Sequence, residues 1–335
     1  MEVQGGGYGG ILMALTDRYK RKIDYVRISV TDRCNFRCRY CMPEEGIPLL
    51  DHRDLLTYEE LSFLCDTLHR MGVRKVRFTG GEPLVRRGFL GFLRGIRDSM
   101  PNLKVALTTN GALLDLYARE IGEIGISGLN VSLDTIQEDK FRYVTRNGEL
   151  KRVLDGLRAS REVGIRSIKV NTVIIRGFND DEIGDILAFC QENDYLLRLI
   201  EFMPMDDGVW SKESFVPAEE ILSKVNRGGR WVPFSTGEEV AGPARYYWDP
   251  ETGQRIGVIS AVSSHFCAWC NRVRVSATGK MRACLFAKEE TDLRRFISSG
   301  DREGLMASIV DTVNSKPRCW EDVATGDLHM SQIGG

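Results

Sequence analysis

The sequence lacks the features that mark a membrane protein or a broad nucleic-acid binder. No apolar run approaches the roughly 20 residues of a membrane span, and the first residues show no basic-then-apolar signal pattern. The 335 residues carry a net charge of −1 and a pI of about 6.5, so no basic excess attracts nucleic acid or an anionic membrane surface. We therefore expect a cytoplasmic protein with no nucleic-acid partner and no membrane partner.

The cysteines also lack the pattern of a disulfide framework. Nine are present, an odd number, and six of them lie in two tight groups. Such grouping is typical of metal ligation in a reducing compartment. The other three, Cys65, Cys190 and Cys319, are scattered along the chain, and we expect them to be structural.

The first cysteine group is one thiolate short of a closed metal site. Cys34, Cys38 and Cys41 have C-x3-C-x2-C spacing, whereas a structural zinc ion or an ordinary iron–sulfur cluster takes four protein ligands. A four-iron cluster held by three cysteines keeps one iron open for a small molecule. The spacing is similar to that of the radical S-adenosylmethionine (SAM) enzymes, which implies that SAM chelates the open iron. The alternatives are unrelated buried cysteines or a zinc site completed by His52 or His69.

The second cysteine group is also one ligand short. Cys267, Cys270 and Cys284 have C-x2-C-x13-C spacing, and no second C-x2-C pair follows as in a zinc ribbon. A second four-iron cluster with an open iron is the favoured interpretation, and an open iron again implies a ligand. Structural zinc with His265 as the fourth ligand is the alternative.

Between residue 24 and about residue 203, short β-type runs alternate with helical ones. Six β/α units in series predict a parallel sheet with right-handed crossovers, and their number favours an open, partial (β/α)6 TIM-like barrel. A doubly wound Rossmann sheet is the alternative, but the cysteine loop follows the first strand where Gly-x-Gly-x-x-Gly would be needed. The predicted strands are 25–30, 75–78, 104–109, 128–133, 167–174 and 196–203.

Helical periodicity fills the segments between these strands. Thr57 and Glu60 form a capping box that starts the first helix. Later helices are predicted at about 112–124, 150–163 and 180–193, with Gly125, Gly164 and Asn193 as their C-terminal stops.

After Met203 the pattern changes. A helix opened by Pro217 precedes short aromatic and β-branched runs, which predict antiparallel strands, and two helices follow at about 290–298 and 302–314. The short runs are 231–234, 244–248, 255–260, 272–276 and 280–285. We expect a flexible lead-in (1–20), a barrel core (21–204), a C-terminal domain of antiparallel strands and helices carrying the second cluster (205–325), and a tail ending in Gly-Gly (326–335).

Polar groups follow four successive strands. The cysteine loop comes after the first, and the segments 79–83, 108–111 and 132–134 come after the next three. Read alone, the Gly-Gly-Glu-Pro of the second segment is a plain turn and the others are helix caps. Because active sites lie at the C-terminal ends of barrel strands, together they predict one shared ligand site.

Cations lie inside apolar strand sequences. An unpaired charge there would be expensive, and for any one of them a salt bridge is the simplest explanation. Arg272 and Arg274 alternate directly after Cys270, so their side chains point the same way. Six such groups predict a common polyanion, and a triphosphate fits. The six are Arg27, Arg77, Lys169, Arg198, Arg272 and Arg274.

Taken together, these motifs resemble the GTP 3′,8-cyclases (the MoaA family), the radical SAM enzymes of molybdenum cofactor biosynthesis. The resemblance runs from about residue 20 to the last residue and covers TDRCNFRCRYCMP, FTGGEPLVR, LTTNG, VSLD, IKVNTV, EFMP and FCAWCNRVR. It implies that reductive SAM cleavage gives a 5′-deoxyadenosyl radical, which abstracts the C3′ hydrogen of GTP. Bond formation between C3′ and C8 then gives 3′,8-cyclo-7,8-dihydro-GTP.

The resemblance also implies roles for individual residues. Cys34, Cys38 and Cys41 would hold the SAM-binding [4Fe–4S] cluster, and the second cysteine group a [4Fe–4S] cluster that binds GTP. On physics alone a terminal Gly-Gly favours disorder, whereas the resemblance implies that Gly334 and Gly335 reach the active site and serve catalysis. SAM would contact Tyr40, Gly81, Ser132 and Met203, and GTP would contact Arg27, Arg77, Thr108, Lys169, Arg198, Arg272, Val273 and Arg274.

Further partners follow from the same resemblance. It implies an electron donor of unidentified nature, a homodimer, and delivery of the product to the next pathway enzyme, cyclic pyranopterin monophosphate synthase. The runner-up is a radical SAM peptide-modifying enzyme, although such enzymes usually carry more C-terminal cysteines. A zinc-dependent scaffold leaves the Gly-Gly-Glu-Pro segment and the internal cations unexplained.

Overall fold

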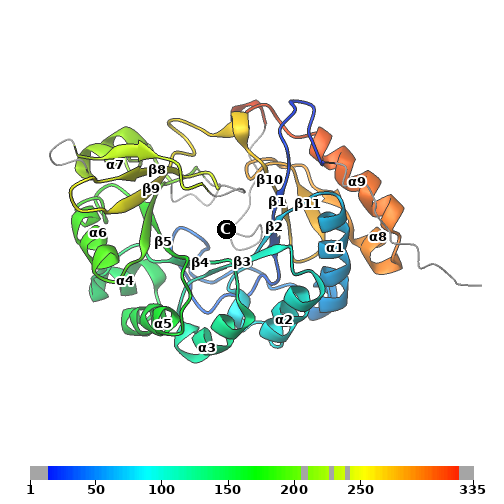
Figure 1. Cartoon of the computed structure of the whole chain (residues 1–335), viewed down its shortest axis with the longest axis horizontal. Coiled ribbons are helices and arrows are strands. Elements are labelled where there is room, and N and C mark those ends of the chain that lie inside the picture. The colour runs from blue at the N-terminus through cyan, green and yellow to red at the C-terminus, as the bar shows by residue number, and fades with distance from the viewer. Residues whose placement is uncertain (1–13, 205–209, 226–229, 238–241, 324–335) are drawn as a thin grey trace, which may run out of the picture.

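The strands form one sheet that curves around the interior of the molecule (Figure 1). The computed structural model describes residues 14–204, 210–225, 230–237 and 242–323. Within these ranges the strand order is β12-β11-β10-β1-β2-β3-β4-β5-β6-β9-β8-β7. The central strands follow one another in chain order and pair in parallel: β1 (Tyr25–Ser29), β2 (Lys75–Thr79), β3 (Lys104–Thr109), β4 (Gly128–Ser132), β5 (Ile168–Ile174) and β6 (Leu196–Glu201).

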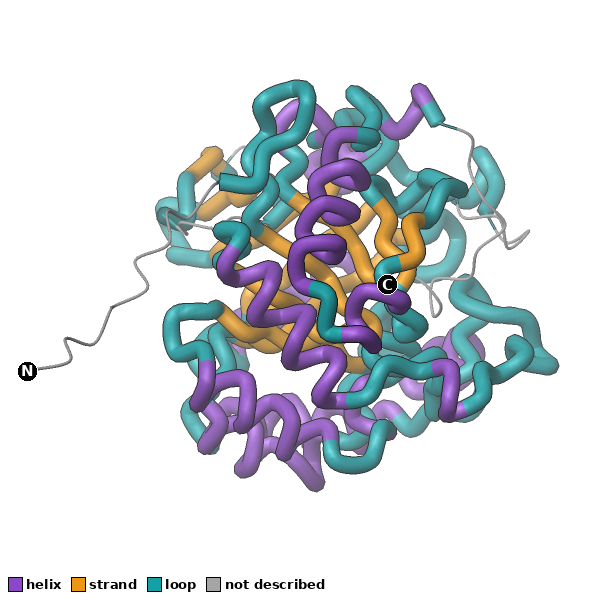
Figure 2. Tube along the Cα trace, turned by 90° about the vertical axis from the view of Figure 1, so that its right-hand side faces the viewer, coloured by secondary structure: helices purple, strands orange, loops and turns teal. Residues whose placement is uncertain are grey.

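Helices connect the central strands and cover the outer face of the sheet (Figures 1 and 2). Sequential strand order with helices on one face is that of a partial TIM-type barrel, whereas a doubly wound sheet reverses its order and carries helices on both faces. The expected open (β/α)6 barrel is therefore confirmed. Its helices are α1 (Tyr58–Arg70), α2 (Phe89–Ser99), α3 (Leu114–Ile124), α4 (Glu138–Thr145), α5 (Leu150–Glu162) and α6 (Ile183–Glu192).

The capping box predicted for α1 is present. Thr57 Oγ1 accepts a hydrogen bond from the Glu60 amide (3.2 Å), and the Glu60 carboxylate accepts one from the Thr57 amide (2.8 Å). Gly125, at the end of α3, has φ = 69°, a left-handed conformation that glycine adopts without strain. These local signals set the first and last turns of the helices that the periodicity predicts.

Two helices of the barrel were not predicted. Helix α2 contains Gly91 and Gly95, which lower its intrinsic helix propensity. The helix forms because its apolar face packs on the sheet. The ring centroids of Phe89 and Phe92 lie 6.1 and 5.2 Å from the ring centroid of Phe78 on β2. Helix α4 spans only eight residues, which is too short for a clear period. Tertiary packing therefore decided both helices.

The C-terminal strands extend both edges of the barrel sheet. They are β7 (Val232–Phe234), β8 (Arg245–Trp248), β9 (Arg255–Ile259), β10 (Arg272–Val275), β11 (Lys280–Arg282) and β12 (Thr291–Asp292). Most of their pairs are antiparallel, as expected, but β9 pairs in parallel with β6, and β10 in parallel with β1. The expected antiparallel pairing is confirmed for both strands, β9 with β8 and β10 with β11. Their parallel pairing on the other side was not predicted, and it covers an edge that the open barrel would otherwise expose.

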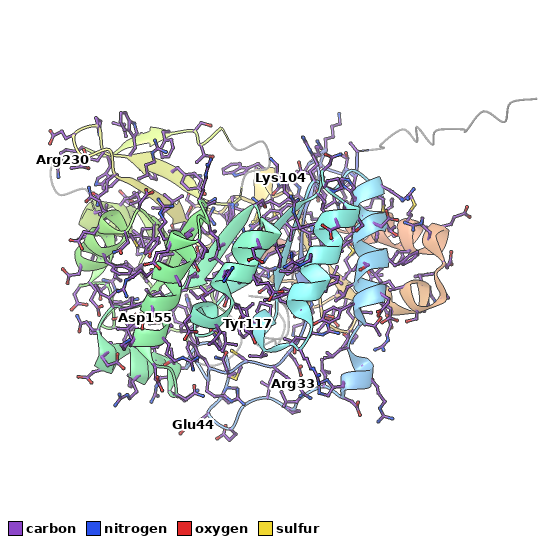
Figure 3. All side chains as sticks on the ribbon, turned by 60° about the horizontal axis from the view of Figure 1, so that its bottom comes forward. Arg33, Glu44, Lys104, Tyr117, Asp155 and Arg230 are labelled. Atoms are coloured by element: carbon purple, nitrogen blue, oxygen red, sulfur yellow. The ribbon has the colours of Figure 1, made fainter. Side chains whose placement is uncertain are left out.

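One end of the barrel collects the loops in which the sequence motifs lie. Figure 3 labels Lys104, at the start of β3, and Glu44, in the loop after β1, at opposite ends of the molecule. Parallel strands all point toward the same end, so the loops after β1 to β4 gather near Glu44 and Arg33. The remaining helices are α7 (Ala218–Val225), α8 (Arg294–Ser299) and α9 (Arg302–Asn314), and none of the helices described is long and apolar enough to cross a bilayer.

Candidate active site

The loop after β1 presents its cysteines among backbone and amide donors. The Phe36 amide donates to Cys34 Sγ (3.4 Å), and the Asn110 side chain, at the end of β3, approaches the same sulfur at 3.7 Å. A tight turn follows, in which the Cys41 amide donates to the Cys38 carbonyl (2.9 Å). Burial raises the pKa of the Cys34 thiol to about 12. A metal ion that binds this sulfur would displace the proton of the thiol at neutral pH.

The Gly-Gly pair after β2 packs directly against this cysteine loop. A Cβ atom at Gly80 would lie 2.6 Å from the Thr31 carbonyl oxygen, and one at Gly81 would lie 2.3 Å from the Arg33 carbonyl oxygen. The Gly81 amide donates to the Thr31 carbonyl (2.8 Å). The glycines therefore permit close approach of the cysteine loop, which any side chain would prevent.

Glu82 joins the ends of β2 and β3. Its fully buried carboxylate accepts hydrogen bonds from the Asn110 amide (2.7 Å), the Thr109 hydroxyl (2.8 Å) and the Leu84 amide (3.0 Å). Burial raises its pKa to about 7 even though these donors oppose the shift. Both oxygens are engaged by the protein, so Glu82 positions the motif loops rather than presenting a carboxylate to a ligand.

Tyr40 links the cysteine loop to the far side of the barrel. Its hydroxyl donates to the Asp134 carboxylate after β4 (2.5 Å), and the other oxygen of Asp134 accepts from the Val173 amide on β5 (2.9 Å). The Tyr40 ring also lies edge-on to Phe202, with 6.4 Å between centroids. Burial raises the pKa of Asp134 to about 6 and that of Tyr40 above its usual value.

One cavity inside the barrel collects most of the predicted site residues. Cys34, Cys38, Gly81 and Lys169 do not line it, although Lys169 is buried on β5 beside it, and Gly334 and Gly335 lie outside the described residues. The lining includes Arg27, Tyr40, Cys41, Arg77, Thr108, Ser132, Arg198, Met203, Cys267, Cys270, Arg272, Val273, Arg274 and Cys284.

Three of the arginines form a row across adjacent strands. Arg27 on β1 is in register with Arg77 on β2 and with Arg274 on β10. Burial lowers the pKa of Arg27 to about 10, and repulsion from Arg77 and Arg272 adds to the shift while Tyr25 opposes it. Burial also lowers the pKa of Arg274. Such a concentration of buried positive charge favours an anion in the cavity.

The simplest alternative, a salt bridge for each cation, fails for three of them. Arg77 donates to the Tyr25 hydroxyl (2.6 Å) and the Leu107 carbonyl (2.6 Å), Arg198 donates to the Tyr246 hydroxyl, and Arg272 lies 4.7 Å from the Phe266 ring. No carboxylate in the described part of the chain pairs with Arg77, Arg198 or Arg272.

Tyr25 is a site residue that the sequence analysis missed. It lies on the same face of β1 as Arg27, lines the cavity and accepts a hydrogen bond from Arg77 Nε (2.6 Å). Burial would raise its pKa, but the charges of Arg77, Arg27 and Lys75 outweigh burial and lower the pKa to about 7. The signal was available, because period-two alternation places residues 25 and 27 on one face.

The second cysteine group is reached through a loop anchored by Glu201 at the end of β6. Its fully buried carboxylate accepts from the amides of Val262 (2.7 Å) and Ser263 (3.0 Å), a few residues before Cys267. Burial would raise the pKa of Cys270, but the Lys316 ammonium and the Arg272 guanidinium lower it to about 7.

Buried Lys316 also connects the two parts of the second cysteine group. It donates to the Arg272 carbonyl (2.8 Å) and the Ala283 carbonyl (2.6 Å), next to Cys284. Lys316 lines the cavity, and sequence analysis missed it because it lies far along the chain from the motifs.

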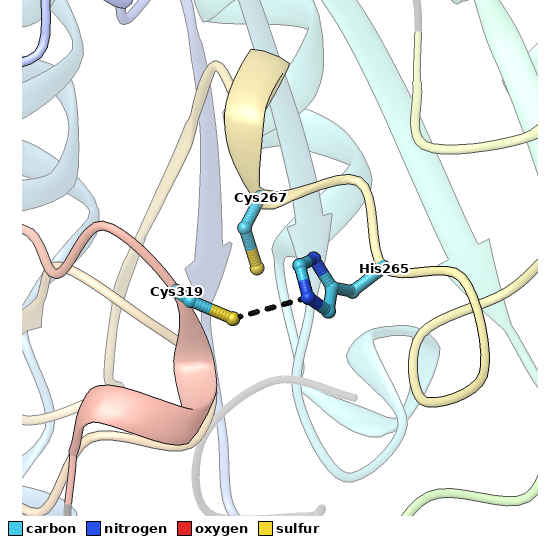
Figure 4. Close-up of side chains that lie close together, drawn as sticks. All are labelled: His265, Cys267 and Cys319. Atoms are coloured by element: carbon cyan, nitrogen blue, oxygen red, sulfur yellow. Dashed lines mark hydrogen bonds between the residues drawn. The ribbon is translucent and has the colours of Figure 1, made fainter.

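Cys319 does not match the expectation of a scattered structural cysteine. Its Sγ lies 3.3 Å from His265 Nε2, and His265, Cys267 and Cys319 bring their ligand atoms within 4.8 Å of one another (Figure 4). The expected zinc alternative paired His265 with the three motif cysteines; the structure pairs it with Cys267 and Cys319. Cys65 and Cys190, by contrast, are buried in the core as expected.

The zinc alternative for the first group has no support among the described residues. His69 lies in the last turn of α1, where its Nδ1 is 3.0 Å from the Val73 carbonyl, and His52 is exposed. No group of ligand atoms close enough for one ion includes either histidine in the part of the chain described.

Comparisons with known proteins identify relatives of this chain. The Radical SAM superfamily model matches residues 28–190, and the Molybdenum Cofactor Synthesis C model matches residues 195–321. The GTP 3′,8-cyclases of Peptoclostridium acidaminophilum and Geobacter sulfurreducens are each 42% identical to this chain, covering 96% of it and 98% and 100% of their own lengths. That of Thermodesulfovibrio yellowstonii is 39% identical, covering 96% of this chain and all of its own.

Solved structures show the same fold at low identity. The crystal structure of Streptococcus suis SuiB bound to S-adenosylmethionine superposes with a TM-score of 0.60 at 14% identity, covering 89% of this chain and 68% of SuiB. A structure of SuiB bound to its precursor peptide SuiA gives a TM-score of 0.51 at 16% identity, covering 62% of this chain and 47% of SuiB.

Proposed function

Because the chain belongs to the GTP 3′,8-cyclase family of the radical SAM superfamily, we propose that its cavity converts GTP to 3′,8-cyclo-7,8-dihydro-GTP. This is the first step of molybdenum cofactor biosynthesis. Reductive cleavage of SAM would give methionine and a 5′-deoxyadenosyl radical, which would take the C3′ hydrogen of GTP before C3′ bonds to C8. A second electron from the donor and a proton would then quench the radical left on the purine and complete the 7,8-dihydro product. Identity of 42% over nearly the full length of two relatives supports this assignment.

The SAM half of the site would centre on the loop after β1. Cys34, Cys38 and Cys41 fit a [4Fe–4S] cluster in the chemistry of the donor set: three thiols in one loop, with N–H donors directed at Cys34. That cluster, when bound, supplies the electron that cleaves SAM. Tyr40, Ser132 and Met203 line the cavity beside Cys41 and would hold SAM, with the Gly81 backbone beside the cysteine loop.

The strongest support for the proposal comes from the part of the cavity that would bind GTP. A row of buried arginines on β10, β1 and β2 faces the same cavity as Cys41 and the second cysteine group, and a triphosphate would neutralise it. Arg27, Arg77 and Arg274 would form this phosphate site. Thr108, Lys169, Arg198, Arg272 and Val273 would complete the GTP contacts.

Cys267, Cys270 and Cys284 would hold a second [4Fe–4S] cluster. All three line the cavity, and the lowered pKa of Cys270 supports a thiolate ready to bind iron. An iron left open by three ligands would take the guanine base. That would fix the ribose near the origin of the radical.

The remaining roles rest on family membership. Gly334 and Gly335 are proposed to serve catalysis, so their deletion would leave the fold intact and stop cyclisation. We also propose an electron donor, delivery of product to cyclic pyranopterin monophosphate synthase, a homodimeric state and a cytoplasmic location. Nine free cysteines support a reducing compartment.

An anaerobic assay tests the function directly. The protein is reconstituted with iron and sulfide, given SAM and a reductant, and offered each nucleoside triphosphate in turn. We expect 5′-deoxyadenosine and a cyclised product with GTP alone, and neither with a Cys38→Ser control. Product from another nucleotide, or SAM cleavage without any cyclised nucleotide, would overturn the substrate assignment.

A further inference from the structure

A second set of metal-binding atoms lies beside the motif cysteines. His265, Cys267 and Cys319 bring one ligand atom each within 4.8 Å of one another, and the Cys319 thiol faces His265 Nε2 at 3.3 Å (Figure 4). The other ring nitrogen, His265 Nδ1, is buried without a hydrogen-bond partner among the described residues. No acceptor at Nδ1 therefore fixes the tautomer of the ring, and a metal ion bound at Nε2 would set it.

A buried arginine holds the two thiol-bearing segments together. Arg21 donates to the Cys267 carbonyl (2.7 Å) through Nη1, which also approaches the Arg318 carbonyl (3.2 Å), and to the Pro317 carbonyl (2.7 Å) through Nη2. It is only 7% exposed, and its Nε is paired with Asp17 (2.5 Å). The approach of Cys319 to Cys267 is thus imposed by the fold, not by two mobile side chains.

Further contacts fix the segment on either side of Cys319. The Cys319 amide donates to the Asp322 carboxylate (3.0 Å), and the Trp320 ring packs on Phe286 with 4.7 Å between centroids. The loop that carries His265 is held by Glu201, which accepts from the Ser263 amide (3.0 Å). All three ligands therefore project from anchored backbone.

The spacing fits one ion rather than a cluster. With metal–sulfur bonds of about 2.3 Å and metal–nitrogen bonds of about 2.0–2.1 Å, the ligands of one tetrahedral zinc ion lie roughly 4 Å apart. In a four-iron cluster each thiolate binds a different iron, so its ligands lie farther apart. Two thiolates and an imidazole with an open fourth position also suit the ligand preferences of Zn²⁺.

We propose that His265, Cys267 and Cys319 bind a single thiophilic divalent ion, Zn²⁺ in the first instance, before the second cluster is assembled. The inference rests on the proposed function in one respect: Cys267 is shared with the proposed second cluster. The two occupants therefore exclude each other, and zinc at this site withholds Cys267 from cluster assembly.

The test uses full-length protein freed of iron and sulfide under anaerobic, reducing conditions. Zn²⁺ affinity is measured by competition with a chromophoric chelator, and Co²⁺ serves as a spectroscopic probe of thiolate and imidazole ligands. We expect Cys319→Ser and His265→Gln to weaken the tightest site by at least about tenfold and to reduce the thiolate-to-cobalt absorption. Cys270→Ser, Cys284→Ser and Cys65→Ser should leave that site unchanged.

Opposite results would overturn the inference. If Cys270→Ser or Cys284→Ser lost the ion while Cys319→Ser kept it, zinc would sit in the three motif cysteines. The inference is equally wrong if none of the variants differs from wild type. Failure of the proposed function is separate, because the absence of a GTP product from wild type would not alter these zinc titrations.

A second measurement does not depend on zinc affinity. Iron and sulfide reconstitution is repeated with one equivalent of Zn²⁺ added first. Wild type should incorporate roughly half of its iron, since the second of two similar clusters is blocked, whereas Cys319→Ser should incorporate the full amount. Equal inhibition of both proteins would contradict the competition for Cys267.

Discussion

The two cysteine groups share a three-thiol design but have opposite electrostatic surroundings. Burial raises the pKa of Cys34 to about 12, and its contacts are neutral N–H donors. Cys270 is buried too, yet Lys316 and Arg272 lower its pKa to about 7. The cations that stabilise the second group adjoin the arginine row, so this half of the cavity suits a polyanion. The first group has no cation among these contacts, which suits the proposed ligand SAM, whose net charge is about +1.

The largest expected effect is loss of a thiol from the first group. Cys38→Ser should leave no 5′-deoxyadenosine above background, because three thiolates are the only protein anchors of the proposed cluster. Anaerobic turnover followed by chromatography measures it, with Cys65→Ser as the matched control in the core. If Cys38→Ser cleaved SAM at near wild-type rate, the first cysteine group would not differ from the second in being required for SAM cleavage.

Removing the second group should have a different result. Replacement of Cys267, Cys270 and Cys284 by Ser should lower iron and sulfide content to roughly half. The first cluster should remain and still cleave SAM, uncoupled from cyclisation, so 5′-deoxyadenosine appears without cyclised GTP. Iron analysis and product chromatography on one sample check both statements. Full iron content in this variant would show that the second group holds no cluster.

Local signals predicted the parts of the fold that depend on local sequence. Strand and helix periods gave the parallel barrel, and Thr57 with Glu60 marked the start of α1. Pairing direction is not local: β9 and β10 have the same alternation whether their neighbours run parallel or antiparallel. The open edges of the barrel sheet, which β9 and β10 cover, decided the direction in which these strands pair.

Within the site, the motifs predicted most of the cysteines and cations that line the cavity, although Cys34, Cys38 and Lys169 do not line it, and they did not predict what surrounds these residues. Cys319 lies beside the second group through contacts made across the fold, among them those of Arg21. Glu82 belongs to a segment (79–83) that was predicted to take part in a ligand site, yet residues at the end of β3 occupy both of its carboxylate oxygens. Contacts between residues that are distant in sequence cannot be predicted from the spacing of the motif residues.

An intermediate effect is expected from single arginines of the polyanion half. Arg274→Ala should weaken GTP binding by about ten- to a hundredfold, because a charge-assisted hydrogen bond is worth about 1.5–3 kcal/mol. Iron content and SAM binding should not change. Calorimetric titration with GTP tests this, with the exposed Arg94→Ala as control. Equal weakening of SAM and GTP binding would mean that the two halves are not electrostatically distinct.

The smallest effect concerns Tyr25, which reports the charge of the arginine row. Arg77, Arg27 and Lys75 outweigh burial and lower its pKa to about 7, so the folded protein favours the ionised phenol. The contribution of Tyr25 ionisation to the free energy of unfolding is therefore absent below pH 7. It grows as the pH rises toward about 10, which is the pKa of a tyrosine in the unfolded chain. A bound triphosphate should offset the cations and raise this pKa again.

Ultraviolet difference spectra of the cluster-free protein measure that titration, with Tyr25→Phe as the subtraction control. We expect one tyrosinate to form near neutral pH in wild type and to be absent from the control. Inorganic tripolyphosphate should move the transition to higher pH, because its oxygens take the arginine charge that stabilises the phenolate. A transition near pH 10 with and without the anion would mean that the row does not act on Tyr25. The charge difference between the two cysteine groups would then come from Arg272 and Lys316 alone, with no contribution from the arginine row.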